Sequence, residues 1–466
     1  MKPRQILILG LILSVLIVAL VIQRIQKPRG LVTEEFSSLN FNFDVPSVSK
    51  VQIGKGGGKG TKDILLFTIV KDDKVGWRIP DFFNAQADPN KIQNLLKEIQ
   101  KMKGELRAED KSLYSDFAIT EEEAFRIILS DQNWKTLLTL YIGSKRPDYN
   151  TIFIRKADSN LVYRTDVNLL GEMGVYGDPE KEKPQMDFWA ALNLVKLDVD
   201  KVEQLETKRI QGGKEVITSG VVRELDPSDS SKKKWKYVRP NVPFALGADK
   251  IKQFLAALGS WQAQKVLDPK AKDYGFTKPQ WQMTIQQDAG ESKKESMIIL
   301  AGGTDPETKG YYIQVSGQSV VFLLPDYLFK NFDIDDSKFF ADNPLAADPE
   351  STESLVIAAD KKQLSFKPKV KKWETIANYL NELKTFSVTH LLFEPGEQKK
   401  AAASNRRLEI QKTGSPPLII EVGEAVSEQP KEYAARKADG TQPFAISEPL
   451  YKKLFDNLDS LSEPKK

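Results

Sequence analysis

Residues 198–205 read Asp-Val-Asp-Lys-Val-Glu-Gln-Leu, and two related segments stand at 44–53 (Asp-Val-Pro-Ser-Val-Ser-Lys-Val-Gln-Ile) and 348–357 (Asp-Pro-Glu-Ser-Thr-Glu-Ser-Leu-Val-Ile). Each segment opens with Asp and continues into alternating apolar residues, which is the period-two pattern of a strand with one buried face. The copies lie about 150 residues apart. This regular spacing predicts that the chain repeats one structural unit three times.

An amphipathic helix is expected after the opening strands of each unit. Residues 91–99, 250–258 and 376–383 carry apolar side chains at positions i, i+3, i+4 and i+7, a stripe wide enough to lie on a sheet. Asp88 and Asp249 precede the first two stripes, and we expect them to be the N-caps of these helices. The order of strands and helix is therefore shared by the units.

Each unit then returns to strands, and one of these strands ends on a glycine. Gly143, Gly302 and Gly423 follow runs rich in Leu and Ile. The pattern predicts an antiparallel sheet with a covering amphipathic helix, used three times in tandem. Sheets and helices arranged in this way belong to the α+β class.

The predicted boundaries are 1–30 for an N-terminal membrane anchor, 40–190 for repeat unit 1, 191–341 for unit 2 and 342–466 for unit 3. Unit 3 is shortened, because the hairpins that end near Trp77 and Trp235 have no counterpart in it. We expect these two tryptophans at equivalent places, with both side chains largely buried.

The anchor is predicted from residues 6–22, which are all apolar except Gly10 and Ser14. At about 1.5 Å per residue, this run covers most of a hydrocarbon core of about 30 Å. It passes into polar sequence without a small-x-small cleavage site, so we expect it to be retained. Basic residues flank it on both sides, so charge alone leaves the orientation open. They are Lys2, Arg4, Arg24, Lys27 and Arg29.

The amino-acid composition excludes several kinds of functional site. The chain has 68 basic and 64 acidic residues, a formal charge of +4, and no cysteine. Disulfides, thiol nucleophiles and thiolate zinc sites are therefore excluded, and the even balance of charge does not favour nucleic-acid binding. We predict no catalytic, cofactor-binding or metal-binding residues, and no cofactor.

Three motifs resemble functional sequences but favour structural interpretations. Residues 54–61 are rich in glycine and lysine but lack the order of a phosphate-binding loop, so they predict a hairpin tip. Residues 231–234 and 412–414 match the Ser-x-x-Lys and Lys-Thr-Gly elements of penicillin-recognising serine enzymes. Their surroundings predict a polar loop for the first, including the lysines 232–234, and a turn for the second.

Other candidate residues also have simpler explanations. His390 is the one histidine and is expected in a strand or at a strand edge. Residues 333–337 begin like a calcium loop but lack its later Gly and Glu, so we interpret them as a linker. Trp261 and Trp281 could form a platform for sugars, although core packing is favoured. The chain has 64 acidic residues, so the sequence alone leaves open whether two of them form the paired carboxylates of a glycosidase.

Several of these motifs together resemble a known family. They are the hairpin end at Trp77-Arg78-Ile79-Pro80, the Ala-Asp pairs at 87–88 and 248–249, the Tyr274-Gly275-Phe276 segment, and the strand ends that carry glycine. The pattern resembles the bacterial family called domain of unknown function 4340, over nearly the whole chain. Unit 3 departs from it, because it lacks the Trp hairpin and the Tyr-Gly-Phe segment.

The resemblance implies a functional setting. Members of that family carry an N-terminal membrane helix and are often encoded beside ABC-type transporters and components of gliding-motility export. It therefore implies a single-pass protein of the bacterial inner membrane with an outward-facing soluble region, which contacts transporter or auxiliary membrane subunits. The first hypothesis is a non-enzymatic accessory or scaffold protein. The alternatives are an anchored envelope hydrolase and a module that binds a cell-wall polymer or glycan.

Overall fold

The computed structural model describes residues 36–58, 64–73, 75–211, 214–290, 293–359, 362–368, 373–456 and 458–461. The predicted anchor at residues 6–22 lies outside these ranges. Within them, no helix combines the length and the apolar character needed to cross a membrane.

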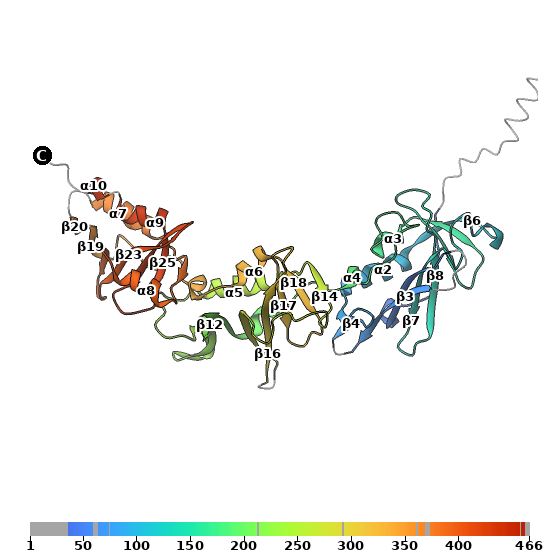
Figure 1. Ribbon diagram of the computed structural model, residues 1–466, viewed down its shortest axis with the longest axis horizontal. Coiled ribbons are helices and arrows are strands. Elements are labelled where there is room, and N and C mark those ends of the chain that lie inside the picture. The colour runs from blue at the N-terminus through green and yellow to red at the C-terminus, as the bar shows by residue number, and fades with distance from the viewer. Residues whose placement is uncertain are drawn as a thin grey trace, which may run out of the picture. The chain divides into compact units, whose positions relative to one another are not determined.

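The described chain forms two compact units. One contains the residues up to Phe82 together with Gln86–Ala190, and the other contains Phe83–Ala85 and the residues from Ala191 onward. The first unit has one sheet and the second has two (Figure 1). Strand pairs in all three sheets are antiparallel, and helices accompany each sheet, so the predicted α+β class is confirmed. The predicted division at residues 341 and 342 falls inside the second compact unit.

The first sheet has ten strands in the order β1-β6-β10-β9-β8-β7-β2-β3-β4-β5. Its central strands bury alternate side chains, such as Val51 and Ile53 in β2 and Ile127 and Leu129 in β7, as period-two sequence requires. The strands are β1 Ser37–Ser38, β2 Lys50–Gly56, β3 Ile64–Asp72, β4 Gly76–Ile79, β5 Ala85–Gln86, β6 Lys103–Ala108, β7 Phe125–Ser130, β8 Thr136–Ile142, β9 Phe153–Lys156 and β10 Val162–Thr165.

The second compact unit contains an eight-stranded and a seven-stranded sheet. The eight strands are β11 Val202–Gln211, β12 Lys214–Asp226, β13 Asp229–Tyr237, β14 Lys265–Leu267, β15 Trp281–Asp288, β16 Lys294–Thr304, β17 Tyr311–Val315 and β18 Val321–Leu324. The seven are β19 Thr352–Ala359, β20 Lys362–Phe366, β21 His390–Leu391, β22 Arg406–Lys412, β23 Leu418–Glu428, β24 Lys431–Lys437 and β25 Phe444–Ser447.

The three sheets follow one strand order. The second sheet reads β13-β12-β11-β15-β16-β17-β18-β14, and the third reads β20-β19-β22-β23-β24-β25-β21. The first sheet contains the same path as β4-β3-β2-β7-β8-β9-β10-β6, with β1 and β5 added at its ends. Among the described residues, the third sheet has no counterpart of the outer strands β4 and β13, which agrees with the expected loss of its hairpin.

One amphipathic helix follows the opening strands of each sheet. These helices are α2 (Pro89–Lys101), α5 (Ala248–Leu258) and α7 (Trp373–Leu383), and each buries the predicted stripe. Asp88 caps α2 by accepting the N–H of Asn90. The N-cap predicted at Asp249 is wrong: Gly247 holds that position, and Asp249 lies in the first turn, where its charge still suits the helix dipole.

Shorter helices connect the strands. They are α3 Leu169–Glu172, α4 Met186–Trp189, α6 Asp326–Phe332, α8 Pro395–Ala402, α9 Glu448–Phe455, α10 Leu458–Leu461, and the 3-10 turns η1 Val45–Ser47, η2 Lys111–Leu113, η3 Val199–Lys201 and η4 Asp336–Phe339.

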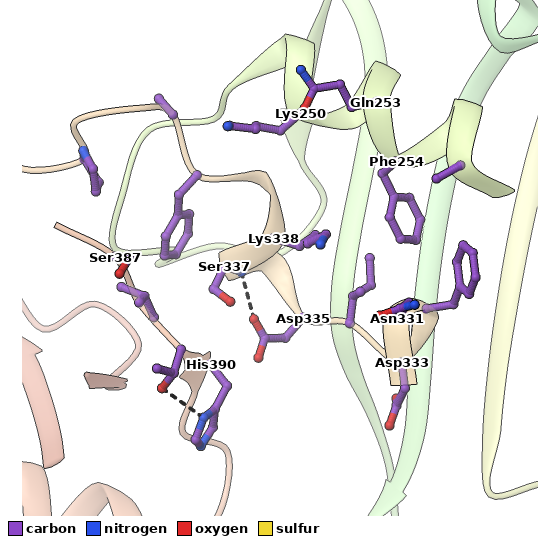
Figure 2. Close-up of a pocket in the computed structure, with 18 of the residues that line it drawn as sticks. Lys250, Gln253, Phe254, Asn331, Asp333, Asp335, Ser337, Lys338, Ser387 and His390 are labelled. Carbon is purple, nitrogen blue, oxygen red and sulfur yellow. Dashed lines mark hydrogen bonds between the residues drawn. The ribbon is translucent and has the colours of Figure 1, made fainter. Parts of the chain in front are cut away.

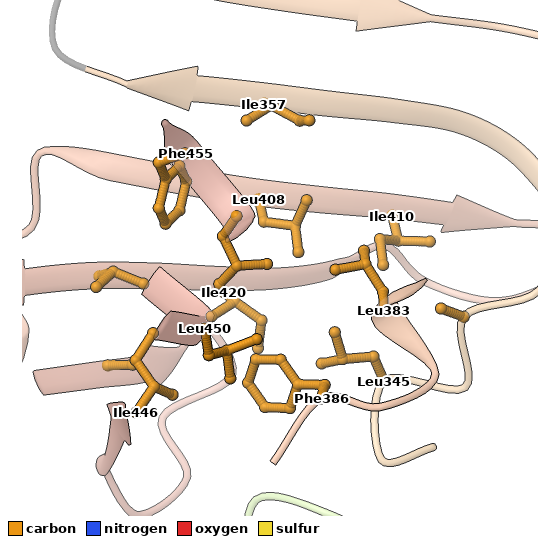
Figure 3. Close-up of a cluster of buried hydrophobic side chains, with 14 of the residues drawn as sticks. Leu345, Ile357, Leu383, Phe386, Leu408, Ile410, Ile420, Ile446, Leu450 and Phe455 are labelled. Atoms are coloured by element: carbon orange, nitrogen blue, oxygen red, sulfur yellow. The ribbon is translucent and has the colours of Figure 1, made fainter. Parts of the chain in front are cut away.

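The third sheet shows how the core is built. Figure 3 shows Ile357, Leu408 and Ile420 on the sheet, with Leu383 and Leu450 from the helices packed against them. These side chains are fully or nearly fully buried. Burying each large aliphatic side chain contributes about 1.5–3 kcal/mol, so this layer is the main stabilising contact between sheet and helices.

The three glycines predicted at strand ends have a common cause. Gly143 does follow the end of β8, but the prediction is wrong for Gly302 and Gly423, which lie within β16 and β23. A Cβ atom on Gly143, Gly302 or Gly423 would lie 2.5, 2.1 or 2.0 Å from the carbonyl oxygen of Phe117, Tyr274 or Lys400, respectively. In each sheet a preceding segment therefore brings its backbone close to the glycine. Only glycine leaves room for such an approach.

Trp77 and Trp235 lie in β4 and β13, which hold equivalent places in the strand order. Both side chains are partly buried, so the expectation that they are largely buried is met only in part. β4 and β13 lie at or near one end of their sheets.

Candidate functional site

A hollow lies in the second compact unit, beside η4. It is an open groove of about 1110 Å³, bordered by α5, by the stretch from α6 to residue 344, and by residues 384–390 before β21. Figure 2 shows Lys250, Gln253 and Phe254 from α5 on one side and Ser387 and His390 on the other, with Ser337 and Lys338 of η4 between them. We call this hollow the η4 groove.

Asp336 is fully buried under the η4 groove. Its two oxygens accept hydrogen bonds from the Arg239 Nε, at 2.7 Å, and from the backbone N–H of Gly220, at 2.9 Å. Burial raises the pKa of Asp336, and the nearby Arg239 guanidinium partly opposes this rise. The pair fixes η4 to the second sheet, since β12 and the residues after β13 supply the two donors.

Asp335 is nearly fully buried and joins two sheets. Its oxygens accept the N–H groups of Ser337 and Leu391, each at 2.8 Å. Leu391 belongs to β21, the edge strand of the third sheet. Asp335 therefore caps η4 and satisfies an outward-facing N–H of that strand.

Asp333 ends α6 and pairs with Arg209 of β11. The Arg209 Nε lies 2.6 Å from a carboxylate oxygen of Asp333, and its Nη2 donates to the Asp333 carbonyl at 3.0 Å. The interpretation of residues 333–337 as a linker is thus wrong, because three aspartates in this stretch are structural acceptors. Apolar Ile334 and Phe339, both buried, were the sequence signal against a solvated linker.

His390 lies in β21, so the expected edge position is confirmed. Its Nδ1 is 3.3 Å from the hydroxyl of Thr389 and 3.7 Å from a carboxylate oxygen of Glu432. A catalytic base must lie within about 2.6–3.2 Å of the nucleophile it activates. The hydroxyl beside His390 belongs to its neighbour in an edge strand, which differs from a triad arrangement.

Five cationic side chains line the groove: Arg209, Lys250, Lys330, Lys338 and Lys384. Arg209 pairs with Asp333, and Lys330 pairs with Asp326. Lys250 pairs with the exposed Asp342 at 2.9 Å. Lys338 and Lys384 are exposed, and within the described ranges neither makes an ion pair. The groove is therefore polar and has an excess of positive charge at its rim.

The Lys-Thr-Gly segment is a turn after β22, as predicted. The Lys412 ammonium donates to the backbone carbonyls of Leu345, at 3.3 Å, and Ala346. Burial lowers the pKa of Lys412. The lysine therefore holds the linker before the third sheet and does not face a catalytic serine.

The polar loop predicted for residues 231–234 is wrong, because these residues lie within β13. Lys233 pairs with Glu203 at 2.8 Å, and Lys234 pairs with Asp226 at 2.5 Å. The Lys234 ammonium and Ser228 lower the pKa of Asp226 to about 2. Cross-strand ion pairs thus account for this basic run.

The glycine-rich segment at residues 54–61 begins in β2 of the first unit. Lys55 in β2 is nearly buried, and its ammonium donates to the carbonyls of Pro179, Glu180 and Glu182 at 2.6, 2.7 and 3.1 Å. Burial lowers the pKa of Lys55. The lysine fastens a loop to the sheet. Residues 54–56 of the predicted hairpin tip lie in β2, and residues 59–61 lie outside the described ranges.

The two tryptophans considered for a sugar platform are core residues. Trp261 is 1% exposed and Trp281 is 2% exposed, and their rings meet edge to face at 6.3 Å between centroids. A stacked sugar needs an accessible ring face, so neither ring can serve in this state. Across the described part of the chain, no cluster of three or more His, Asp or Glu side chains is arranged to hold a metal ion.

The fold and groove together define an α+β protein with three antiparallel sheets of one strand order and a polar groove beside η4. The chain belongs to the family "Domain of unknown function (DUF4340)", whose sequence profile matches residues 77–279 and 244–406. The two matches overlap at residues 244–279. No curated protein and no solved structure is significantly similar to the chain.

Proposed function

We propose that this protein is a membrane-anchored, non-enzymatic accessory or scaffold subunit of a bacterial envelope transport system. Its anchor is the apolar run at residues 6–22, and its soluble region faces away from the cytoplasm. Three copies of one unit, at 40–190, 191–341 and 342–466, would present surfaces to transporter subunits. The setting in the envelope rests on the resemblance described from the sequence.

The observation that carries the proposal is how the η4 groove uses its ionisable groups. Asp333, Asp335 and Lys250 are each held by a structural partner, and His390 lies at an edge strand beside Thr389 and Glu432. Acid–base and nucleophilic catalysis require a reactive group with its activating partner aimed at the substrate. Groups that brace the fold support a binding role better than a catalytic one.

An anchored hydrolase remains the main alternative, and point variants distinguish it from a scaffold. His390→Ala and Ser387→Ala should leave the cellular phenotype unchanged when the protein folds, because neither residue is expected to do chemistry. A well-folded variant of a single serine, histidine or carboxylate that abolishes function while partner binding persists would favour the hydrolase.

The direct test is purification of the full-length protein from its native membrane. We expect subunits of an ABC-type transporter or its auxiliary membrane proteins to co-purify in fixed proportion. Recovery of the intact protein without any such subunit, under conditions that keep other membrane complexes together, would contradict the proposal.

Orientation needs a separate experiment. A reporter enzyme that is active only outside the cytoplasm, fused after Lys466, should be active. An intact but inactive fusion would place the soluble region on the opposite side.

A further inference from the structure

The three amphipathic helices end in the same way, so the residues that follow them can be aligned between the three units. The N–H groups of Met102, Trp261 and Phe386 donate to the carbonyls of Ile99, Leu258 and Leu383, respectively. Each helix then leads into β6, β14 or β21; β14 and β21 are edge strands, whereas β1 pairs outside β6. Residues 102–104, 261–263 and 386–388 are therefore equivalent.

In the first unit a strand from before the sheet covers this edge. Ser38 pairs with Lys103 and Ser37 with Gly104, and the N–H of Leu39 donates to the carbonyl of Met102 at 3.2 Å. The outward-facing backbone groups of residues 102–104 thus have partners.

The second sheet repeats the arrangement with the chain that enters it. Asn193 bridges to Gln262, the N–H of Leu194 donates to Trp261 at 3.0 Å, and the N–H of Ala263 donates to Leu192 at 2.8 Å. Two units of this fold therefore hold an extended segment at one place.

The third sheet lacks this segment. Residues 340–347 and 384–391 are all described, and among the described residues none donates to the Phe386 carbonyl and none accepts the Val388 N–H. The entering chain forms a turn instead: the Asn343 carbonyl, which corresponds to that of Leu192, accepts the N–H of Ala346 at 2.7 Å.

The turn is firmly held. The Asn343 side chain makes two hydrogen bonds with the backbone of Ala347, at 2.8 and 3.0 Å, and Leu345 is 1% exposed in the core of the third sheet. Asn343 has a φ of +55°, which an extended strand does not permit. The linker is therefore held in the turn. A strand that pairs with residues 386–388 has to come from another segment or another protein.

The η4 groove lies where the covering segment is missing. Residues 340–344 form one border and residues 384–390 form another. Ser387 and Thr389 are exposed, while Phe386 is buried and Val388 half-buried, which is the alternation of an edge strand. Figure 2 shows Ser387 and His390 along this border. An unpaired edge of this kind is a template for an added strand.

We propose that the η4 groove binds an extended, acidic peptide segment of a partner protein, which adds as a strand to residues 386–388. The rim cations Lys338 and Lys384 provide the charge complementarity, and the backbone of residues 386–388 provides the hydrogen bonds. This inference rests on the proposed function, because it names the kind of partner segment that the accessory protein would hold.

A designed peptide tests the groove without knowledge of the partner. The probe is Thr-Glu-Val-Thr-Val-Glu-Thr, added to the full-length protein in detergent, and binding is followed together with hydrogen exchange at the Val388 amide. We expect binding that slows this exchange. A form of the peptide that is N-methylated on alternate residues should bind about tenfold more weakly, since it loses backbone donors. Equal binding of both forms, or no protection of Val388, would overturn the proposal.

The second sheet supplies a matched variant. Asn343→Leu with Pro344→Asn copies residues 192 and 193 into the linker, so the linker should pair with residues 386–388 and exclude the probe. We expect protection of Val388 without peptide and a loss of peptide binding of about tenfold or more. Unchanged peptide binding to a folded variant whose Val388 amide has become protected would overturn the proposal.

Charge is tested separately. Lys338→Glu with Lys384→Glu should weaken binding of the acidic peptide several-fold, whereas Lys214→Glu with Lys294→Glu, exposed positions in β12 and β16 outside the groove, should leave it unchanged. Equal effects of the two sets would show that only overall charge matters and would contradict the site.

Purification from the native membrane then separates the two proposals. If the folded linker variant loses the peptide but retains the same transporter subunits as the wild type, the groove is not the partner site and the accessory function stands. If the wild type binds the peptide but recovers no such subunit, the proposed function fails and the strand-addition site stands.

Discussion

The Asp335 carboxylate accepts the backbone N–H of Leu391 at 2.8 Å, although the two residues are 56 positions apart. The bond joins the end of the second sheet's helical segment to the edge strand of the third sheet. The other carboxylate oxygen of Asp335 accepts the N–H of Ser337. One buried side chain therefore accepts hydrogen bonds from two backbone N–H groups. Leaving such groups without a partner in a protein interior costs free energy.

Asp335→Asn should destabilise the second compact unit. Asparagine has one acceptor oxygen, so one of the two N–H groups loses its partner, at a cost of about 1–3 kcal/mol. Chemical denaturation of the full-length protein, with a probe in the third sheet, measures the change. Asp342→Asn is the control, because Asp342 is 90% exposed and should change stability by less than about 0.5 kcal/mol. Equal stabilities of the two variants would show that the bond to Leu391 contributes nothing.

The Arg239–Asp336 pair should show strong coupling in a double-mutant cycle. Removing one partner leaves the other without its counter-charge, so Asp336→Asn or Arg239→Met alone should cost about 3–5 kcal/mol. The double variant should cost clearly less than the sum, because no uncompensated charge remains. Additive losses would indicate that the two groups are not coupled in the folded protein.

Gly302 in β16 of the second sheet should resist substitution. Gly302→Ala places a Cβ 2.1 Å from the Tyr274 carbonyl, so the backbone must shift at a cost of about 1–3 kcal/mol. Gly396 in α8 is the matched control, since a Cβ there meets nothing within 4 Å. Gly396→Ala should raise stability by up to about 1 kcal/mol through helix propensity. Thermal unfolding of both variants gives the comparison, and a tolerated Gly302→Ala would contradict the close approach.

The local features of this fold could be predicted from the sequence, and the groove could not. The stripes of α2, α5 and α7 depend on spacing within one segment, so periodicity was sufficient to find them. The sequence also singled out Gly143, Gly302 and Gly423, but it did not show that two of them lie within strands, nor that each is needed because a backbone carbonyl of another segment lies close to it.

The groove depends on contacts between segments far apart in the chain. Asp335 looked like part of a solvated linker, because its partner Leu391 belongs to another sheet. The unpaired edge at residues 386–388 becomes visible only when three sheets are compared in register. Sequence comparison does show that Pro344 stands where the second unit has Asn193, and that difference marked the place where the linker departs from a strand.

The acid sensitivity of the second sheet should depend on Asp305. Its carboxylate accepts from the N–H and hydroxyl of Thr308 and from the hydroxyl of Tyr312, and these bonds lower its pKa to about 2 from an ordinary value of 3.8. A carboxyl group whose pKa is lower in the folded state binds fewer protons there than in the unfolded state. Its contribution to stability is therefore complete above about pH 4 and is lost as the pH falls toward 2.

Asp305→Asn removes this titration and should flatten the decline. The unfolding midpoints of the wild type and the variant, measured between pH 2 and pH 6, should converge at the acid end. There the wild type has lost the stabilisation from the ionised Asp305 carboxylate, which the variant lacks at every pH. Asp288→Asn, in a turn at the end of β15, serves as the comparison. If the difference between wild type and Asp305→Asn stays constant down to pH 2, the hydrogen bonds from Thr308 and Tyr312 do not favour the charged carboxylate.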